Sequence, residues 1–214
     1  MQQTKASMQI NITGRKEKPF SSACERNKGP ILQKLKLYLG DRQTRVFEVG
    51  SGTGQHALFF TQEMASLIWT PSDIKQRLEG IQAWINSAPR SQVMPPVEFE
   101  LGKHTDIGGS FDMLYSANVL HIVSEPRGQD LFDLVARQLP GLGAAVFYGP
   151  FKYGGQFTSQ SNAKFDQSLK VHSSESGIRD FEWVDSELAQ RGFRLKHDFS
   201  MPANNRLLIF VPNN

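Results

Sequence analysis

The sequence predicts an α/β fold built on a mostly parallel sheet. Strand-like apolar runs alternate with helix-like patterns between about residues 45 and 148, a glycine-rich loop follows the first run, and two further runs close the chain. Such alternation is typical of parallel sheets, because each helix carries the chain back to the same edge. The 214 residues, of which 39% are hydrophobic, are enough for one domain with a buried sheet.

Two short helices are expected ahead of the sheet. The segment Ser22-Ala23-Cys24-Glu25 has the form of a capping box, and Pro30 suits the first turn of a second helix that ends near Leu39. The first strand is predicted at Arg45 to Val49, and the helix after the glycine loop begins near Gln55. These last two elements form one strand, loop and helix unit.

The same unit is repeated along the chain. Further strands are predicted at Ser66 to Thr70, Val97 to Leu101, Phe111 to Ser116 and Ala144 to Tyr148. The helices between them are indicated by two apolar stripes, which are Ile74, Leu78, Ile81 and Ile85, then Leu131, Leu134, Val135 and Leu139 before Gly141. The predicted sheet is five strands wide at this point.

Two features distinguish the C-terminal part. The stretch from Gly149 to about Asp180 is polar and too long for an ordinary connection, so we interpret it as a lid or substrate wall. A helix is then predicted near Trp183 to Gln190. Strands at Phe193 to Ser200 and Arg206 to Val211 flank Ala203-Asn204-Asn205, whose residues tolerate a left-handed turn, and this predicts an antiparallel hairpin.

Composition limits the function classes. The longest apolar stretches, such as Gly143 to Phe151, are far shorter than the roughly 20 residues of a membrane span. The start of the chain, Met1 to Pro19, is too polar for a signal sequence. We therefore expect a flexible leader over residues 1–19, a single domain over 20–214, a cytoplasmic location and no membrane partner.

Metal and nucleic-acid sites are not expected. Cys24 is the only cysteine, which rules out an internal disulfide and a thiolate metal cluster, and His56, His104, His172 and His197 lack metal-ligand spacing. The formal charge of +3 comes from basic residues spread along the chain, and Arg15-Lys16-Glu17-Lys18 is interpreted as a solvated leader rather than a docking arm. The protein is expected to be a monomer or a homodimer.

The loop Gly50-Ser51-Gly52-Thr53-Gly54 indicates a site for a nucleotide-like ligand. Glycines between a buried strand and a helix let a ligand approach the backbone, and the helix N-terminus offers free N–H groups. The dinucleotide fingerprint places glycine at its first, third and sixth positions, whereas the sixth position here is Gln55. The spacing therefore disfavours NAD, and the alternative to a ligand site is a purely structural turn.

Asp73 is the expected partner of this loop. It ends the second strand, where a carboxylate can accept the hydroxyl protons of a ribose. The alternative is that Asp73 caps the helix that follows, and the two roles are compatible.

These residues resemble those of class I S-adenosylmethionine (SAM)-dependent methyltransferases. In that class an acidic residue precedes G-x-G-x-G after strand one and another ends strand two, and Glu48 and Asp73 occupy those places. A narrower resemblance is to the domain-of-unknown-function 938 family, also called methyltransferase-like protein 26. It rests on segments 19–32, 50–56, 69–73, 116–122, 148–151, 177–180 and 201–205, which span nearly the whole chain after the leader.

The resemblance implies a Rossmann-like fold with seven strands in the order 3-2-1-4-5-7-6, in which the hairpin supplies strands six and seven. It implies SAM as the cofactor, and the residues expected to bind it are Glu48, Gly50, Ser51, Gly52, Gly54 and Asp73. Glu100 is expected to contact the adenine side of SAM. In this it departs from the family pattern, which has aspartate at this position. Asn118 is expected either to bond the amino-acid end of SAM or to satisfy its own loop. Arg26 either pairs with the SAM carboxylate or lies on a helix surface.

His121 is the best candidate for a catalytic base. Methyl transfer from a sulfonium needs an in-line geometry, so positioning and exclusion of water supply much of the catalysis. A hydroxyl or thiol acceptor must also lose a proton, and His121 lies just beyond strand four at the carboxyl edge of the sheet. The alternative is that His121 hydrogen-bonds within a helix cap or shapes the pocket.

Aromatic and polar residues after strand five are the candidates for the acceptor side. Tyr148 and Phe151 flank Gly149-Pro150 at the edge where open α/β sheets bind ligands, although core packing readily explains one of them. In the polar stretch, the candidate wall residues are Phe157, Asn162, Phe165, Arg179 and Asp180. The alternative for the last two is an exposed ion pair of little energetic value.

The sequence therefore predicts a methyltransferase that acts on a small molecule, since no substantial added domain is present for a macromolecular acceptor. It does not identify that acceptor. One alternative is a SAM-binding or sensing module without turnover. Another is a nucleotide-dependent oxidoreductase, which Gln55 disfavours.

Overall fold

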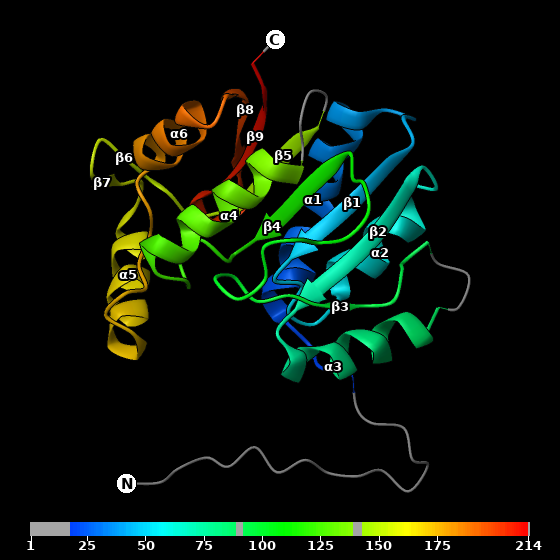
Figure 1. Ribbon diagram of the computed structural model, residues 1–214. Helices are drawn as coiled ribbons and strands as arrows, with labels where there is room; N and C mark the ends of the chain where they lie inside the picture. Colours follow the sequence, from blue (N-terminus) through cyan, green and yellow to red (C-terminus); the bar gives the residue numbers. More distant parts are fainter. Residues whose placement is uncertain (1–17, 89–91, 139–142, 214) are drawn as a thin grey trace, which may run out of the picture.

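The computed structural model describes residues 18–88, 92–138 and 143–213 and is centred on a seven-stranded sheet (Figure 1). The helices are α1 (Ser22–Leu39), α2 (Gln55–Glu63), α3 (Lys75–Asn86), α4 (Glu125–Gln138), α5 (Gln160–His172) and α6 (Phe181–Gln190). The sheet strands are β1 (Thr44–Val49), β2 (Leu67–Asp73), β3 (Val97–Glu98), β4 (Met113–Ala117), β5 (Ala144–Gly149), β8 (Phe193–Met201) and β9 (Asn205–Pro212). The short strands β6 (Lys152–Tyr153) and β7 (Gln156–Phe157) pair with each other outside the sheet.

The strand order confirms the predicted topology. The order is β3-β2-β1-β4-β5-β9-β8, which becomes 3-2-1-4-5-7-6 when the sheet strands alone are numbered. All neighbouring strands are parallel except β9, which is antiparallel to both β5 and β8. The carboxyl ends of β1, β2, β4 and β5 therefore meet at one edge, and the loops that follow them form a common surface.

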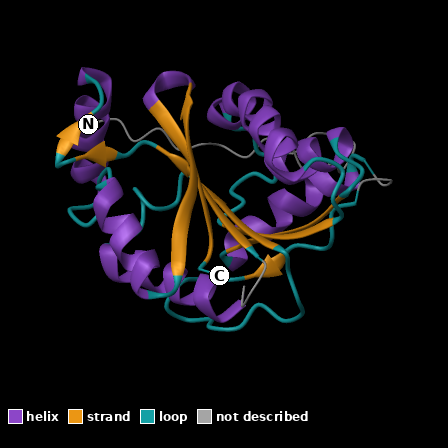
Figure 2. Ribbon diagram, turned by 90° about the horizontal axis from the view of Figure 1, so that it is seen from above, coloured by secondary structure: helices purple, strands orange, loops and turns teal. Residues whose placement is uncertain are grey.

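Helices cover both faces of the sheet, as Figure 2 shows from above. Alternate residues of β5 explain this arrangement, because Val146 and Tyr148 pack into one core while Phe147 packs into the other. Each large side chain that is fully buried stabilises the fold by roughly 1.5–3 kcal/mol. The first core takes in Ile31 and Leu35 of α1 and Phe60 of α2, and the second takes in Leu131 and Val135 of α4 and Val184 and Leu188 of α6.

A single helix precedes the sheet, so the prediction of two short helices was wrong. α1 continues through Pro30, and its N-cap is Ser21, whose side chain accepts a hydrogen bond from the Cys24 N–H at 3.3 Å. The cap therefore lies one residue earlier than the predicted capping box. Pro30 removes one backbone donor, but Ile31 and Leu35 immediately after it are fully buried, and this burial outweighs the lost bond.

The remaining strands form where they were predicted, with small shifts at their ends. β2 continues through Pro71 to Asp73, whereas β3 stops at Glu98. β3 is short because the chain turns just beyond it, and this turn is closed by the Lys103 N–H donating to the Glu100 carbonyl at 3.0 Å. The antiparallel hairpin of β8 and β9 is confirmed. In its turn, Ala203 and Asn204 have the expected left-handed backbone, with φ of 58° and 57°.

The polar stretch after β5 is more ordered than the sequence indicated. It holds the β6–β7 hairpin and the helix α5, which is capped by the Ser159 side chain accepting from the Asn162 N–H at 3.1 Å. A capping serine therefore begins a full helix there, and the interpretation of the stretch as a lid or substrate wall stays a prediction. The longest part of the stretch without a helix or strand is the segment between α5 and α6.

Some predictions fall on residues outside the described ranges. These are the leader up to residue 17 and the positions Leu139 and Gly141 beyond α4. At the start of the described chain, Trp84 of α3 donates its indole N–H to the Pro19 carbonyl at 2.7 Å. Among the described residues, no helix has the length and apolar character that a membrane crossing requires.

Candidate functional site

A large cavity lies at the carboxyl ends of the parallel strands. Its volume is about 840 Å³, within the range typical of small-molecule sites. It is bordered by Val49 at the end of β1, Asp73 of β2, Ala117 of β4 and Tyr148 of β5. This is the edge at which open α/β sheets bind ligands.

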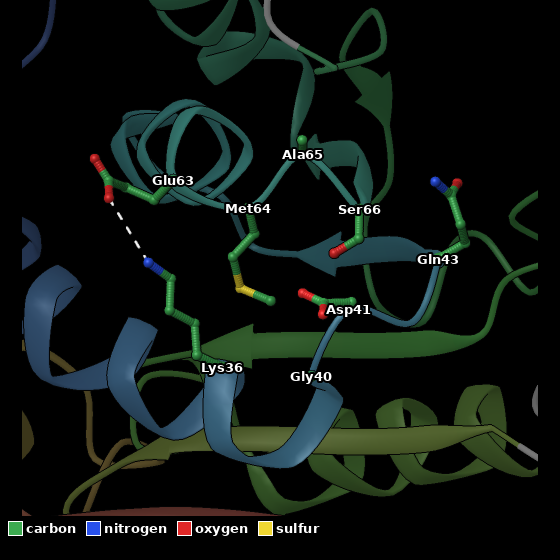
Figure 3. A pocket seen from close by; sticks show the side chains of 8 residues that line it. All are labelled: Lys36, Gly40, Asp41, Gln43, Glu63, Met64, Ala65 and Ser66. Atoms are coloured by element: carbon green, nitrogen blue, oxygen red, sulfur yellow. Dashed lines mark ion pairs between the residues drawn. The ribbon is translucent and has the colours of Figure 1, made fainter.

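A second hollow lies at the opposite ends of β1 and β2 (Figure 3). Its volume is about 550 Å³, and its lining residues are Lys36, Gly40, Asp41, Gln43, Glu63, Met64, Ala65 and Ser66. Lys36 and Glu63 face each other across it at 3.8 Å. None of the residues that the sequence singled out lies there, so the cavity at the carboxyl ends is the candidate site.

The three glycines of the loop have left-handed backbones, but their surroundings differ. A Cβ on Gly50 would come within 2.5 Å of Val119 Cγ2, and one on Gly54 within 3.0 Å of Ile81 Cγ2. These two glycines let the loop pack against its neighbours. Gly52, with φ of 61°, borders the cavity, and a Cβ there would meet no atom within 4 Å. Only Gly52 therefore leaves open space for a ligand against the backbone.

Glu48 and Ser51 brace the loop from behind rather than lining the cavity. Glu48 Oε2 accepts hydrogen bonds from Ser51 Oγ at 2.8 Å and from Trp69 Nε1 at 2.9 Å. Ser51 Oγ in turn accepts from the Ser72 N–H at 3.0 Å. The expectation that both contact the cofactor is corrected, because these buried side chains are oriented into the protein. Burial raises the pKa of Glu48 to about 7.

Replacing Glu48 by glutamine is expected to remove a pH-dependent loss of stability. The folded pKa near 7 lies above the ordinary value of 4.5, so the wild-type protein loses stability as the pH rises through that interval. Glutamine keeps an acceptor for Ser51 and Trp69 but carries no charge. Its unfolding free energy relative to wild type should therefore rise by about 2–3 kcal/mol between pH 5 and pH 8. Denaturant unfolding at both pH values measures this difference, and parallel pH profiles for the two proteins would contradict it.

Asp73 holds the loop and faces the cavity. Its Oδ2 accepts from the Gly52 N–H at 2.7 Å, and its Oδ1 accepts from the Ile74 N–H at 2.8 Å. The N-cap of α3 is Ile74 and has no side-chain cap bond, so the capping alternative was wrong. Burial raises the pKa of Asp73, while the two backbone donors and Arg77 act in the opposite direction. The carboxylate thus places Gly52 and retains further lone pairs on the cavity side.

Gln55, at the position where a dinucleotide site needs glycine, ties α1 over the loop. Its Oε1 accepts from the Ser21 N–H at 2.6 Å and from Thr53 Oγ1 at 3.0 Å. Because the start of α1 is thereby brought to the cavity, Cys24 and Asn27 become lining residues. Sequence reasoning missed both residues, since nothing in the pattern of α1 indicates where the helix docks.

Three further residues predicted for the cofactor also line the cavity. Arg26 of α1 reaches it and makes no ion pair with any residue in the described part of the chain. Glu100 also lines the cavity and is paired with Lys103 at 2.7 Å. Asn118 has a left-handed backbone with φ of 60°, and its N–H donates to the Tyr148 carbonyl at 2.7 Å. The loop after β4 is therefore bent sharply where it enters the site.

His121 lines the same cavity from this loop. Its side chain is buried, and within the described residues its ring nitrogens have no hydrogen-bond partner. Burial lowers the pKa of His121 to about 4, and the charge of Arg179 acts in the same direction. The ring lies edge-on to Phe165 of α5, with centroids 5.4 Å apart. A helix-capping role is thus corrected, because the imidazole is neutral and unpaired at neutral pH.

A buried hydrogen-bond network that sequence reasoning missed includes Asn27 of the cavity lining. Burial raises the pKa of Tyr148, which lines the cavity, and the side chains of Asn27 and Asn205 act in the opposite direction. Asn27 Oδ1 lies 2.7 Å from His56 Nε2, and His56 Nδ1 lies 3.3 Å from the Tyr115 hydroxyl. Burial lowers the pKa of His56 to about 3. His56 is thus a buried, locally hydrogen-bonded residue that contacts Asn27 at the cavity.

The other residues predicted for the acceptor wall do not line the cavity. Phe151 is buried in the second core, and Phe157 lies on the β6–β7 hairpin with a cation–π contact to Lys152. Asn162 Nδ2 donates to Thr158 Oγ1 at 3.0 Å and to the Asn204 carbonyl at 3.1 Å, and so supports the hairpin turn. These assignments are corrected, because the side chains of Phe151 and Asn162 are used inside the fold and Phe157 is exposed on the hairpin, away from the cavity lining.

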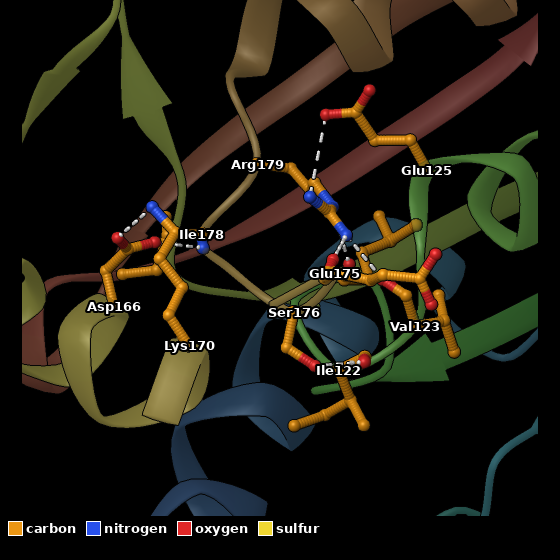
Figure 4. A network of polar contacts seen from close by, with 10 residues as sticks. Ile122, Val123, Glu125, Asp166, Lys170, Glu175, Ser176, Ile178 and Arg179 are labelled. Atoms are coloured by element: carbon orange, nitrogen blue, oxygen red, sulfur yellow. Dashed lines mark hydrogen bonds and ion pairs between the residues drawn. The ribbon is translucent and has the colours of Figure 1, made fainter. Parts of the chain in front are cut away.

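The predicted pair of Arg179 and Asp180 is not an exposed ion pair. Arg179 donates to the carbonyls of Leu120 and Val123 and is 3.6 Å from Glu125 (Figure 4). Asp180 accepts from the Gly155 N–H at 2.8 Å. Neither lines the cavity, and both hold loops. The apolar residues that do line it beside His121 are Ile122, Val123 and Phe165, of which only Phe165 was expected.

A sequence model of the family described as "Protein of unknown function (DUF938)" matches residues 18–212. The chain belongs to the DUF938 family. This match confirms the narrower resemblance, and it assigns no activity. Within the described residues of this DUF938 protein, no group of three or more His, Cys, Asp or Glu is arranged to hold a metal ion.

Solved structures confirm the class I methyltransferase fold for the DUF938 protein. An O-methyltransferase family protein from Burkholderia thailandensis is 17% identical, with a TM-score of 0.75, and the match covers 90% of this chain and 58% of that one. The mitomycin 7-O-methyltransferase MmcR is 12% identical, with a TM-score of 0.77 and coverage of 89% and 54%. Magnesium protoporphyrin IX methyltransferase from Synechocystis PCC 6803, with bound SAH, is 12% identical, with a TM-score of 0.68 and coverage of 92% and 90%. The DUF938 chain spans little more than half the length of the first two.

Proposed function

We propose that this DUF938 protein transfers a methyl group from SAM to a small-molecule acceptor in the cavity at the carboxyl ends of the strands. The observation that carries the proposal is the bond from the Gly52 N–H to Asp73 Oδ2 at 2.7 Å. This bond fixes the glycine loop, in which Gly52 leaves open space for a ligand. The Asp73 carboxylate lines the same cavity. The structural neighbours, among them a methyltransferase with bound SAH, support the same reading.

The residues present fit the parts of SAM. Asp73 has lone pairs for ribose hydroxyls, Gly52 allows close approach of the ligand, and Glu100 also lines the cavity. Arg26, which has no carboxylate partner among the described residues, suits the carboxylate of the amino-acid end. SAM supplies an electrophilic methyl group when it is bound, so the protein needs chiefly to orient the acceptor and exclude water.

The acceptor side contains a base and apolar walls. His121 carries a neutral imidazole with free nitrogens, which can take the proton of a hydroxyl or thiol. Ile122 and Phe165 are 52% and 40% exposed and border the same cavity, so they offer apolar surface to a ligand. The acceptor that fits this site is a small, largely apolar molecule with an ionisable O–H or S–H group.

Replacing Gly52 by alanine is expected to weaken SAM binding at least about tenfold, equivalent to about 1.4 kcal/mol. The added methyl group occupies the space that the cavity leaves against the loop. Gly108 is a matched control, since its φ of 60° and its open surroundings equal those of Gly52, but it lies outside the cavity lining. Calorimetry on Gly52→Ala and Gly108→Ala separates backbone strain from steric exclusion. Equal affinities for SAM in these two variants would argue against the assigned cradle.

Turnover is tested by adding methyl-labelled SAM to a metabolite extract with the protein and searching for labelled products. A labelled small molecule that requires the wild-type protein is the expected result. A second candidate function, a SAM-binding module without turnover, is favoured if SAM binds but no labelled product forms. Binding of NADH in place of SAM would instead revive the oxidoreductase alternative.

A further inference from the structure

The loop that carries His121 is held by a segment distant from it in sequence. Four successive carbonyls, those of Leu120, His121, Ile122 and Val123, accept hydrogen bonds from residues 176–179. Arg179 donates to the first and the last of them, the Gly177 N–H to the second at 3.0 Å, and Ser176 Oγ to the third at 2.6 Å. Figure 4 shows this segment lying against the loop.

Arg179 is the main clamp of the segment. Its side chain is 10% exposed, and its guanidinium donates to the Leu120 carbonyl at 3.1 Å and to that of Glu175 at 2.7 Å, in addition to Val123. Glu125 is 3.6 Å away and adds an ion pair, but that glutamate is largely exposed. A planar group with several fixed donors can hold separate carbonyls at once, which a lysine ammonium cannot do in the same geometry.

The segment is anchored in turn on α5. Asp166 is buried, and its Oδ1 accepts from the Ile178 N–H at 2.8 Å, while its Oδ2 is 2.7 Å from Lys170 Nζ. A Cβ on Gly177 would come within 3.0 Å of Asp166 Oδ1, so the segment lies tightly on the helix. The neighbouring residue Phe165 borders the cavity and contacts the His121 ring.

We propose that residues 175–179 form a positioning strap, in which Arg179, Gly177 and Ser176 fix the loop 120–123 and thereby orient His121 toward the cavity. Through the bond of Asp166 to the Ile178 N–H, the strap also fixes this loop relative to α5. Arg179 and Asp166 are positioning residues, since neither lines the cavity. The role of His121 as a base rests on the proposed function, whereas the strap itself does not require that function.

The test reads the surroundings of His121 without SAM or an acceptor. Histidine labelled with ¹³C at Cε1 gives one NMR signal for each histidine, and the His121 signal is the one lost in His121→Ala. Its pKa in the wild-type protein is expected near 4, because the ring is buried. In Arg179→Lys the positive charge remains but the carbonyl clamp is lost, so water reaches the loop. The pKa of His121 should then rise by about one unit or more toward 6.5.

Arg191 provides the matched control. It is also a partly buried arginine, bound to Asp133 and Glu187 at 2.7 Å each, but it joins α4 to α6 away from the cavity. Arg191→Lys should lower thermal stability and leave the pKa of His121 at its wild-type value. If Arg179→Lys also lowers stability and leaves that pKa unchanged, the strap proposal is overturned.

A smaller substitution keeps the proposal testable if Arg179→Lys does not fold. Ser176→Ala removes only the bond to the Ile122 carbonyl, and a measurable rise in the pKa of His121 is expected in the folded variant. An unchanged pKa in folded Ser176→Ala would then contradict the strap. Calorimetry with SAM on the wild-type protein is measured separately, so a failure of SAM binding refutes the proposed function and leaves the result for the strap intact.

Discussion

Replacing Asp73 by alanine is expected to weaken SAM binding by roughly 100-fold or more. The change removes the carboxylate that faces the cavity and the bond that fixes the Gly52 N–H at 2.7 Å. Hydrogen bonds to a charged group are worth about 1.5–3 kcal/mol each, so the loss of two bonds to a ribose accounts for an effect of this size. Isothermal titration calorimetry with SAM, compared with the wild-type protein, measures it.

The control for Asp73→Ala is Asp106→Ala. Asp106 Oδ1 accepts from the Gly108 N–H at 2.9 Å, so it makes the same kind of carboxylate bond to a glycine N–H, within an exposed loop outside the cavity. The control variant should bind SAM as the wild type does. Wild-type affinity in folded Asp73→Ala would show that the carboxylate does not hold the cofactor.

Replacing His121 by alanine is expected to lower kcat by about 10²–10⁴-fold for a hydroxyl or thiol acceptor, the usual contribution of a positioned base. SAM affinity should change little, since the imidazole is assigned to the acceptor side. The folded pKa near 4 means that the wild-type imidazole is neutral at pH 7 and loses its basic form only as the pH falls through 4. Wild-type kcat should therefore stay level from pH 7 to about pH 5 and decline near pH 4.

The kinetics of His121→Ala are measured with an acceptor found in the labelled-SAM experiment. The variant should bind SAM with the wild-type heat and show the lower kcat across the pH range. Full turnover by His121→Ala with that acceptor would remove the base assignment and leave a role for His121 in shaping the cavity.

The sequence correctly brought Gly52 and Asp73 together at the cavity, because the signals there are local. Gly52 and Asp73 each follow a strand in a parallel sheet, and parallel strands bring their carboxyl ends to one edge. Gln55 was singled out as the departure from a dinucleotide loop, and its side chain in fact ties α1 to that loop. The hairpin turn was also predictable, since Ala203-Asn204-Asn205 has residues suited to left-handed backbone.

The acceptor side was less predictable because it depends on contacts between distant segments. Arg179 was expected in the cavity wall, but its donors are used by a loop more than fifty residues earlier in the chain. Asn162 likewise serves the hairpin turn rather than a ligand. Pro30 was taken as a helix start because proline suits the first turn, whereas the buried residues after it continue a single helix. Tertiary packing decided each of these cases.

The most direct test of the SAM cradle is calorimetric titration of the wild-type protein with SAM, together with its thermal unfolding in the presence of SAM. The account predicts saturable heat for one site per chain and a raised unfolding temperature, because a ligand that binds only the folded state stabilises it. Folded protein that shows neither heat nor thermal stabilisation up to millimolar SAM would contradict the account.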